Sequence, residues 1–238
     1  MPIILTKAYM NNNRKSATAQ SIGRVALLII LLAGSFSSSA QIPVSKEPMH
    51  RVVFQNAWVR LLDVHIPAGD TSLMHKHEIP SVFIVLTNTK TGSEVVVEPA
   101  KLQLTPGNIW FEGFYTSPRI HRVWNSDTSE FHVIDMELLN KTITQIDSPL
   151  NAKDFTLLFD EKPVRGYRFT VGAHATVRIP ARKAPMVIVG LGDASGYVRT
   201  NNKTFEKKGD FMFVPANTAV NAVGMSGTGR QFALLELK

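Results

Sequence analysis

Cysteine is absent from the 238 residues of this chain. Its absence excludes disulfide bonds, a cysteine nucleophile and a lipid anchor attached through cysteine, so stability must come from hydrophobic cores. The sequence also lacks a glycine-rich phosphate loop and the Gly-x-Ser-x-Gly turn that presents a catalytic serine. Nucleotide chemistry and hydrolysis by a serine or cysteine nucleophile therefore find no support.

Acidic residues are missing from the first forty positions, where the only charges are Lys7, Arg14, Lys15 and Arg24. An apolar run, Val25–Ala33, and then small residues ending at Ala40 follow them. This order predicts a secretory signal peptide over residues 1–40 and a periplasmic or secreted protein, with Met1 or Met10 as the start. The alternative is an N-terminal membrane anchor, but the run is shorter than the about 20 apolar residues that a span needs.

Clustered positive charge is also lacking. The net charge of +7 falls to 7 − 4 = +3 once the four basic residues of the leader are removed. The remaining lysines and arginines are scattered, without the stripe that phosphate binding requires, so no nucleic-acid partner is expected. After signal cleavage no membrane span is expected either.

What the chain does contain is a succession of short apolar runs separated by Gly, Pro, Asn and Asp, a pattern typical of an all-β sandwich or barrel. In the first part these runs are Trp58–Ile66, Ser81–Leu86, Glu94–Val97, Asn108–Phe111 and Phe131–Leu138. In the second part they are Tyr167–Val171, Met186–Leu191, Phe211–Val214 and Phe232–Leu237.

The two parts repeat each other. A shift of 105 residues aligns Phe54 with Phe159, Val59 with Val164, Pro80 with Pro185, Val82 with Val187 and Leu86 with Leu191. Further on the shift decreases, and Gly107 matches Gly209 while Phe131 matches Phe232. This pattern indicates a tandem duplication of one β unit. We predict one domain at 41–145 and a second at 146–238, joined by a polar linker around Thr144–Lys153.

Three of the seven histidines form a pattern that suits a metal. His75 and His77 are two apart, so on a strand both point to the same face. His121 follows the Gly107 run and is itself followed by Asn125. Three imidazoles from two strands can occupy adjacent positions of one divalent ion, Fe, Mn, Ni or Zn, and leave open positions for substrate. We expect His50 in a flexible lead-in, His65 at a strand end and His132 in a core or mouth position.

These motifs resemble the cupin superfamily. Its first motif, Gly, five residues, His-x-His, is matched by Gly69 and His75-Lys76-His77, and its second ends in His, three residues, Asn, as in His121 to Asn125. The resemblance implies two tandem cupin-type barrels, each a double-stranded β-helix or jelly roll. Paired barrels of this kind often dimerise, so a homodimer is one expected assembly.

One part of the family pattern is missing. The Glu that usually follows His-x-His is replaced by Ile79, Pro80, Ser81 and Val82. Ser81 keeps the inward parity of the histidines, Glu78 should face outward, and Glu112 could replace the carboxylate from a neighbouring strand. A centre of three neutral imidazoles keeps the full charge of its metal, which favours an anionic, chelating substrate.

The second unit lacks these ligands, because His75 and His77 align with Pro180 and Arg182 and the His121 position lies near Val220. We expect it to be a structural partner without metal. The first unit also has extra length around 114–118, which could roof the mouth of the site. The candidate substrate contacts, from this segment and the strands beside it, are Ser81, Glu112, Tyr115 and Arg119.

The sequence therefore predicts an exported, metal-dependent dioxygenase or isomerase for a small organic anion. Cupin dioxygenases acting on thiols and diketones, which have three-histidine centres, support this interpretation. Two alternatives stay open: a non-catalytic protein that binds a sugar or small acid, and a structural exported protein whose site is vestigial.

Overall fold

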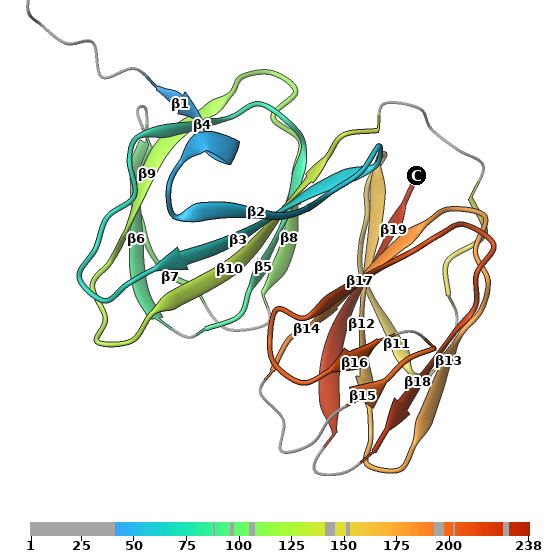
Figure 1. The fold of residues 1–238 in the computed structure, drawn as a ribbon. Coiled ribbons are helices and arrows are strands. Elements are labelled where there is room, and N and C mark those ends of the chain that lie inside the picture. The colour runs from blue at the N-terminus through green and yellow to red at the C-terminus, as the bar shows by residue number, and fades with distance from the viewer. Residues whose placement is uncertain are drawn as a thin grey trace, which may run out of the picture. The chain divides into compact units, whose positions relative to one another are not determined.

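The computed structural model describes residues 41–87, 89–95, 98–104, 108–140, 146–150, 153–192, 198–201, 203–225 and 229–238. The predicted signal peptide, Gly107 and four of the ten residues of the predicted linker (144, 145, 151 and 152) lie outside these residues. Within them the chain is all β apart from one 3-10 helix, η1 (Val44–Lys46), so the predicted fold class is confirmed (Figure 1). No helix in the described part is long and apolar enough to cross a membrane.

The first half of the chain forms two five-stranded sheets, β1-β4-β9-β6-β7 and β2-β3-β10-β5-β8. Their strands are β1 (Ile42–Pro43), β2 (His50–Gln55), β3 (Val59–Ile66), β4 (His75–His77), β5 (Ser81–Val85), β6 (Thr89–Val95), β7 (Glu98–Leu104), β8 (Ile109–Glu112), β9 (Arg119–Asn125) and β10 (Phe131–Leu138).

The second half forms a five-stranded sheet, β11-β12-β19-β14-β17, and a four-stranded sheet, β13-β18-β15-β16. Its strands are β11 (Phe155–Asp160), β12 (Val164–Val171), β13 (Thr176–Ile179), β14 (Met186–Gly190), β15 (Val198–Arg199), β16 (Thr204–Phe205), β17 (Phe211–Val214), β18 (Val220–Gly224) and β19 (Arg230–Leu237).

The strand orders of the two halves correspond. The last strand of each half, β10 or β19, lies in the centre of a five-stranded sheet. Among the described residues no sheet combines strands of both halves. β2, β3, β10, β5 and β8 correspond in order to β11, β12, β19, β14 and β17. The repeat seen in the sequence is therefore a repeat of topology. The exact domain boundary stays a prediction, since it falls between β10 and β11.

Strand pairing corrects one detail of the sequence alignment. Val133 pairs with Val64 on β3, whereas Phe232 pairs with Phe169 on β12. Val64 and Phe169 are 105 residues apart, so Phe232 corresponds to Val133 and not to Phe131 as predicted. The error of two residues keeps the same side of the strand, which is why alternation alone could not reveal it.

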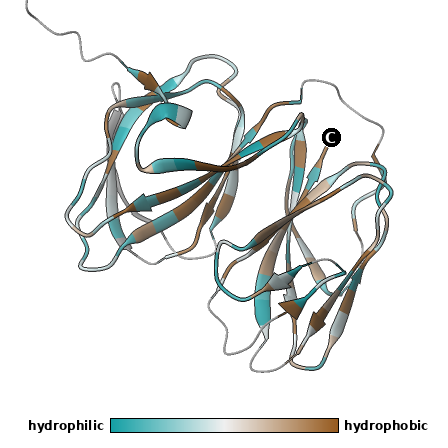
Figure 2. Cartoon of the chain, viewed as in Figure 1, coloured by the Kyte–Doolittle hydropathy of each residue, from teal (hydrophilic) through white to brown (hydrophobic). Residues whose placement is uncertain are grey.

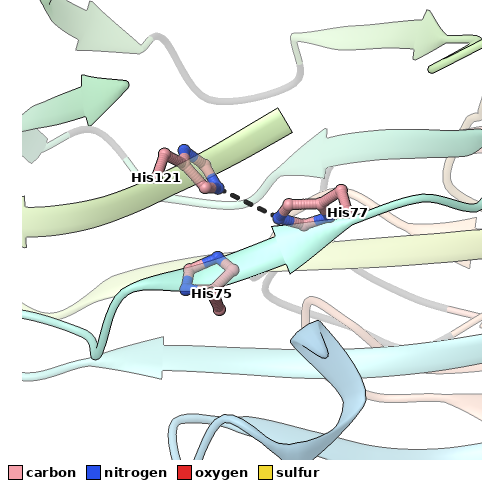
Figure 3. Close-up of side chains that lie close together, drawn as sticks. All are labelled: His75, His77 and His121. Carbon is pink, nitrogen blue, oxygen red and sulfur yellow. Dashed lines mark hydrogen bonds between the residues drawn. The ribbon is translucent and has the colours of Figure 1, made fainter. Parts of the chain in front are cut away.

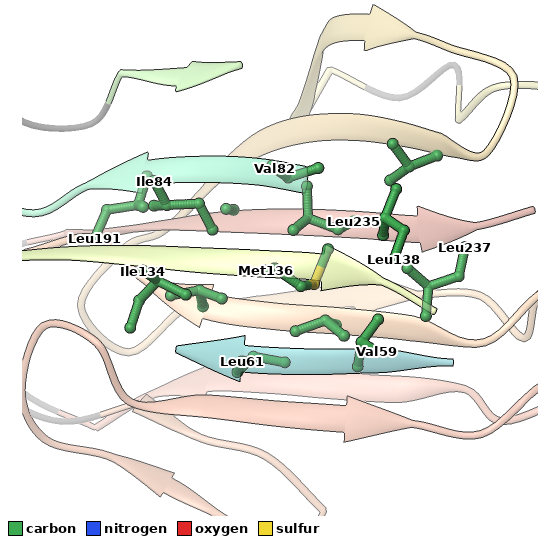
Figure 4. Close-up of a cluster of buried hydrophobic side chains, with 14 of the residues drawn as sticks. Val59, Leu61, Val82, Ile84, Ile134, Met136, Leu138, Leu191, Leu235 and Leu237 are labelled. Carbon is green, nitrogen blue, oxygen red and sulfur yellow. The ribbon is translucent and has the colours of Figure 1, made fainter. Parts of the chain in front are cut away.

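β10 and β19 are buried on both faces, and this follows from a core shared by the two halves. One face of each central strand looks between its own two sheets, and the other packs on the opposite half. Figure 2 shows hydrophobic residues along the central strands of both halves. The shared core is a cluster of buried hydrophobic side chains from both halves, drawn in Figure 4. Its members include Val59, Leu61, Val82, Ile84, Ile134, Met136, Leu138, Leu191, Leu235 and Leu237.

Candidate metal centre

The three predicted ligands converge between the sheets of the first half. His75 and His77 lie on β4, and His121 lies directly opposite His75 on the antiparallel strand β9. Gly69 precedes them in a turn with a φ of 80°, a left-handed conformation that glycine adopts without a steric penalty. Glu78, one residue beyond β4, is exposed and pairs with Lys76, so its predicted outward direction is confirmed.

The imidazoles are close and buried. His77 Nε2 lies 3.0 Å from His121 Nε2, as the dashed line in Figure 3 marks, and the ring centroid of His75 is 4.6 Å from that of His121. His75 is fully buried and His77 and His121 nearly so. One nitrogen from each ring can be chosen so that all three lie within 4.8 Å of one another. The geometry therefore brings together the donor set that the sequence predicted.

The remaining ring nitrogens are held by the protein. His75 Nδ1 donates to the carbonyl of Leu73 at 2.8 Å, and His121 Nδ1 lies 2.9 Å from Ser93 Oγ. Because the proton of neutral His75 is on Nδ1, its Nε2 carries a lone pair, and that buried atom has no hydrogen-bond partner in the described structure. Outer partners of this kind orient metal-binding imidazoles.

Burial keeps the rings of His75 and His121 neutral. Desolvation is the main cause that lowers the pKa of His75 to about 3, and the neighbouring His50 and His77 lower it further. Desolvation likewise lowers the pKa of His121, followed by the effects of His77 and His75. Neutral imidazole is the form that binds metal, so His75 and His121 fit a divalent cation at neutral pH without first losing protons.

Two buried carboxylates that the site prediction did not include lie on β10. Asp135 Oδ2 is 3.4 Å from His77 Nδ1, and neither oxygen of Asp135 has a hydrogen-bond partner among the described residues. Glu137, also buried, accepts a hydrogen bond from Arg60 Nη1 at 2.6 Å. Burial raises the pKa of Glu137, and the negative charge of Asp135 adds to that rise. The sequence did carry a signal, because acidic residues at alternate positions of an apolar strand must point inward together.

His50 does not lie where the sequence predicted. It is buried on β2, and its ring centroid lies 4.6 Å from that of His75. Its Nδ1 is 2.5 Å from Glu47 Oε2, and Glu47 also accepts hydrogen bonds from the backbone N–H groups of Met49 and Leu73. The expected flexible lead-in is therefore a buried wall of the site, held by a carboxylate that no spacing motif indicated.

The candidate substrate contacts lie on β5 (Ser81), β8 (Glu112), β9 (Arg119) and the segment between β8 and β9 (Tyr115). Ser81 is buried and donates to the carbonyl of Ile79, and it pairs across the sheet with Glu112. Both carboxylate oxygens of Glu112 lie 2.8 Å from the guanidinium of Arg119. The carboxylate is thus engaged by a bidentate ion pair, which makes it a poor replacement for the missing ligand.

The extra segment reaches the histidines through a residue that was not predicted. Phe114 stacks on His77 with ring centroids 5.6 Å apart, and the guanidinium of Arg119 lies over the Phe114 ring, 5.7 Å from its centroid. Phe114 has a φ of 50°, a strained conformation for a bulky residue that is typical of functional sites. Tyr115 is 67% exposed, and its ring contacts Phe111.

The second half has no such cluster among its described residues. Arg182, which aligns with His77, is buried there and donates to Glu236 through Nε at 2.9 Å. Arg165 Nη1 donates to the same carboxylate at 3.0 Å. A salt-bridge network therefore occupies the interior where the first half carries imidazoles.

No family model matches the chain, and no curated protein matches its sequence. Solved structures match its fold. YhhW from Escherichia coli is 13% identical, with 81% of this chain and 89% of that chain covered and a TM-score of 0.58. Salicylate 1,2-dioxygenase from Pseudaminobacter salicylatoxidans is 12% identical, with coverage of 98% and 87% and a TM-score of 0.55.

AerE from Microcystis aeruginosa is 10% identical, with 81% of this chain and 98% of that chain covered and a TM-score of 0.52. At such identities the likeness concerns the fold and not the activity. The fold agrees with the resemblance that the His-x-His and His-x-x-x-Asn motifs indicated. This chain has the fold of the cupin superfamily.

Proposed function

We propose that this protein is a metal-dependent enzyme of the dioxygenase type that acts on a small organic anion. The observation that carries the proposal is the buried triad of His75, His77 and His121, with converging nitrogens and a buried lone pair on His75 Nε2. A bound first-row metal would act as a Lewis acid and, in the case of iron, would permit oxygen chemistry. The salicylate dioxygenase with the same fold supports the reaction class.

The protein's own groups would prepare this site in three ways. Leu73 and Ser93 hold the outer nitrogens of His75 and His121, which fixes the rings. The carboxylate of Asp135 can accept a hydrogen bond from an N–H at His77 Nδ1, and this tautomer would leave the lone pair of Nε2 free to bind the metal. Phe114 covers His77 and excludes water from that side.

An anionic substrate follows from the charge of the donors. Neutral imidazoles would leave a divalent charge uncompensated by the inner ligands, and an enolate, thiolate or carboxylate would balance it. A solved complex of the salicylate dioxygenase contains gentisate, which makes hydroxybenzoates reasonable first candidates. Ser81, Tyr115 and Arg119 remain proposed contacts, and replacing Tyr115 and Arg119 without any effect on affinity or turnover would remove those two.

Metal analysis and oxygen uptake test the function together. We expect about one equivalent of Fe, Mn, Ni or Zn bound by the triad, lost in His77→Ala and retained in His174→Asn, which removes an exposed histidine of the second half. Oxygen consumption is then measured with salicylate, gentisate, diketones and thiols. Turnover lost in His77→Ala supports the proposal. Metal without turnover would indicate a binding protein, and no metal under any loading condition would indicate a vestigial site.

Export is proposed from residues 1–40 alone. The mass of the protein recovered from cells should correspond to a chain that begins at Gln41. A mature protein that retains the leader would favour the membrane anchor. The homodimer likewise stays an expectation, to be checked by light scattering.

A further inference from the structure

A second cluster of metal-binding side chains lies on the opposite face of the central sheet. Asp63 and His65 are two apart on β3, so they share a face, and His132 on β10 pairs directly with His65. This face is the one that carries Leu61 and Met136 of the shared core, whereas Leu62 and Asp135 point between the sheets of the first half. The cluster is therefore separate from the triad.

The polar atoms of this cluster converge on one carboxylate oxygen. His132 Nε2 lies 2.7 Å and His65 Nε2 3.1 Å from Asp63 Oδ1. The two imidazoles stack at a centroid distance of 4.0 Å, with 22° between the ring planes. The other oxygen of Asp63 accepts a hydrogen bond from Arg51 Nη2 at 3.0 Å.

Proton positions show why a cation suits this arrangement. His65 Nδ1 is 2.8 Å from Glu130 Oε1 and must donate to that carboxylate. In the neutral ring Nε2 then has a lone pair, which faces the lone pairs of Asp63 Oδ1 at 3.1 Å. Either a second proton on His65 or a bound cation removes this repulsion. Glu130 also provides the outer carboxylate that commonly orients a metal-binding imidazole.

The distances agree with the coordination of a small ion. Donors about 2.0 Å from a tetrahedral Zn²⁺ lie about 3.3 Å from each other, close to the 3.1 Å between His65 Nε2 and Asp63 Oδ1. The shorter contact of His132 requires only a small opening. Solvent can reach the cluster, since the side chain of His65 is 37% exposed, while that of His132 is 8% exposed.

We propose that Asp63, His65 and His132 form a second metal site, specific for a divalent transition metal such as Zn²⁺. Two imidazoles and one carboxylate leave a fourth position for water, a donor set that zinc accepts. The site would link β3 to β10 beside the second half. There Gly209, with a φ of 79°, lies so close to His132 that an added Cβ would be 3.0 Å from its Cε1.

Calorimetric titration of the metal-stripped full chain with Zn²⁺ tests this inference. We expect two Zn²⁺ per wild-type chain, one fewer in His65→Gln, one fewer in His77→Ala and none in the double variant. His174→Asn should keep both. Glu130→Gln should weaken only the second site, by about 10-fold or more, because it removes the outer carboxylate.

The two proposals can fail separately. If folded His65→Gln, checked by circular dichroism, binds as many Zn²⁺ ions as the wild type, the second site does not exist. If His77→Ala binds as many as the wild type while His65→Gln loses one, the triad fails and the second site stands. Retention of full Zn²⁺ affinity in Asp63→Asn would also overturn the proposed donor set.

Discussion

The two halves of the protein use equivalent strands for different interiors. In the first half Glu137 pairs with Arg60, and the corresponding Glu236 of the second half pairs with Arg165. Two residues earlier on the same strands the halves differ, because Asp135 of the first half corresponds to Leu234 of the second. One half therefore holds a buried carboxylate beside an imidazole, and the other a hydrophobic side chain.

The ion pair that the two halves share also has different surroundings in each half. Arg182 of the second half inserts a guanidinium that binds both oxygens of Glu236 and the carbonyl of Ser148. We call Glu236, Arg165 and Arg182 the closed network, because both oxygens of this carboxylate accept hydrogen bonds from the two guanidinium groups. The first half leaves the nitrogens of three imidazoles facing each other. The comparison teaches that a duplicated fold can keep its core while few interior replacements change a cluster of imidazoles into a network of ion pairs.

The largest effect should come from breaking the closed network. Glu236→Gln leaves Arg165 and Arg182 buried without their shared counter-charge, and we expect a loss of about 3–5 kcal/mol in unfolding free energy. Urea denaturation measures it. Metal binding by the first half should be unchanged in protein that stays folded. Glu78→Gln, at an exposed ion pair, is the control and should cost no more than about 1 kcal/mol. A similar loss in both variants would show that the second half does not depend on this network.

Metal bound by the triad should stabilise the folded protein against unfolding. At a free metal concentration 100 times the Kd, ligation adds about 2.7 kcal/mol to the unfolding free energy. Unfolding is compared with and without a chelator in His65→Gln, where only the triad can bind. The added His77→Ala replacement should abolish the difference. If the chelator has the same effect in its presence, the stabilising metal is bound elsewhere.

Asp135 should tune the triad without binding metal itself. Asp135→Asn removes the carboxylate beside His77 Nδ1, and we expect metal affinity to fall by about 10- to 100-fold. Titration with the metal found in the purified protein gives the affinity. Asp154→Asn, an exposed change in the second half, should have no effect. Equal affinities in all three proteins would leave Asp135 with a structural role only.

The smallest effect concerns acid stability of the second half. Burial alone would raise the pKa of Asp160, but hydrogen bonds from Lys238 and Arg165 lower it. A lowered folded pKa means that the stabilisation is present above the unfolded value of about 3.9 and is lost as the pH falls through the folded value. Asp160→Asn should therefore cost up to about 1 kcal/mol at pH 7, a small effect because the carboxylate is partly exposed. Denaturation curves should converge at low pH, and a constant difference from pH 7 to about pH 2 would contradict the ion-pair origin.

Glu137 of the first half should respond in the opposite direction, since burial raises its pKa. Its stabilising contribution is present below the unfolded value of about 4.3 and is lost as the pH rises through the higher folded value. The disadvantage of Glu137→Gln relative to wild type should then shrink as the pH rises. A disadvantage that grows over this range would show that the Arg60 ion pair outweighs burial.

Sequence spacing was sufficient for much of the fold and the triad. Alternation placed His75 and His77 on one face and Glu78 on the other, and the repeat of 105 residues matched β3 with β12. It was insufficient for His50, which belongs to an element with no motif, and for Phe114, whose direction depends on an irregular backbone. Such contacts join segments far apart in the chain, and local patterns carry little information about them.

By itself the sequence determined the all-β class, the duplication and the three histidines of the candidate metal site, because strand periodicity and ligand spacing are local properties of the chain. Tertiary structure alone decided what surrounds those histidines: Asp135 at His77, Glu47 at His50, and Arg119 holding Glu112 away from a ligand role. It also brought Asp63, His65 and His132 together. The physical reason is that hydrogen bonds and electrostatic fields depend on distances across the sheets, which are set only when both layers pack.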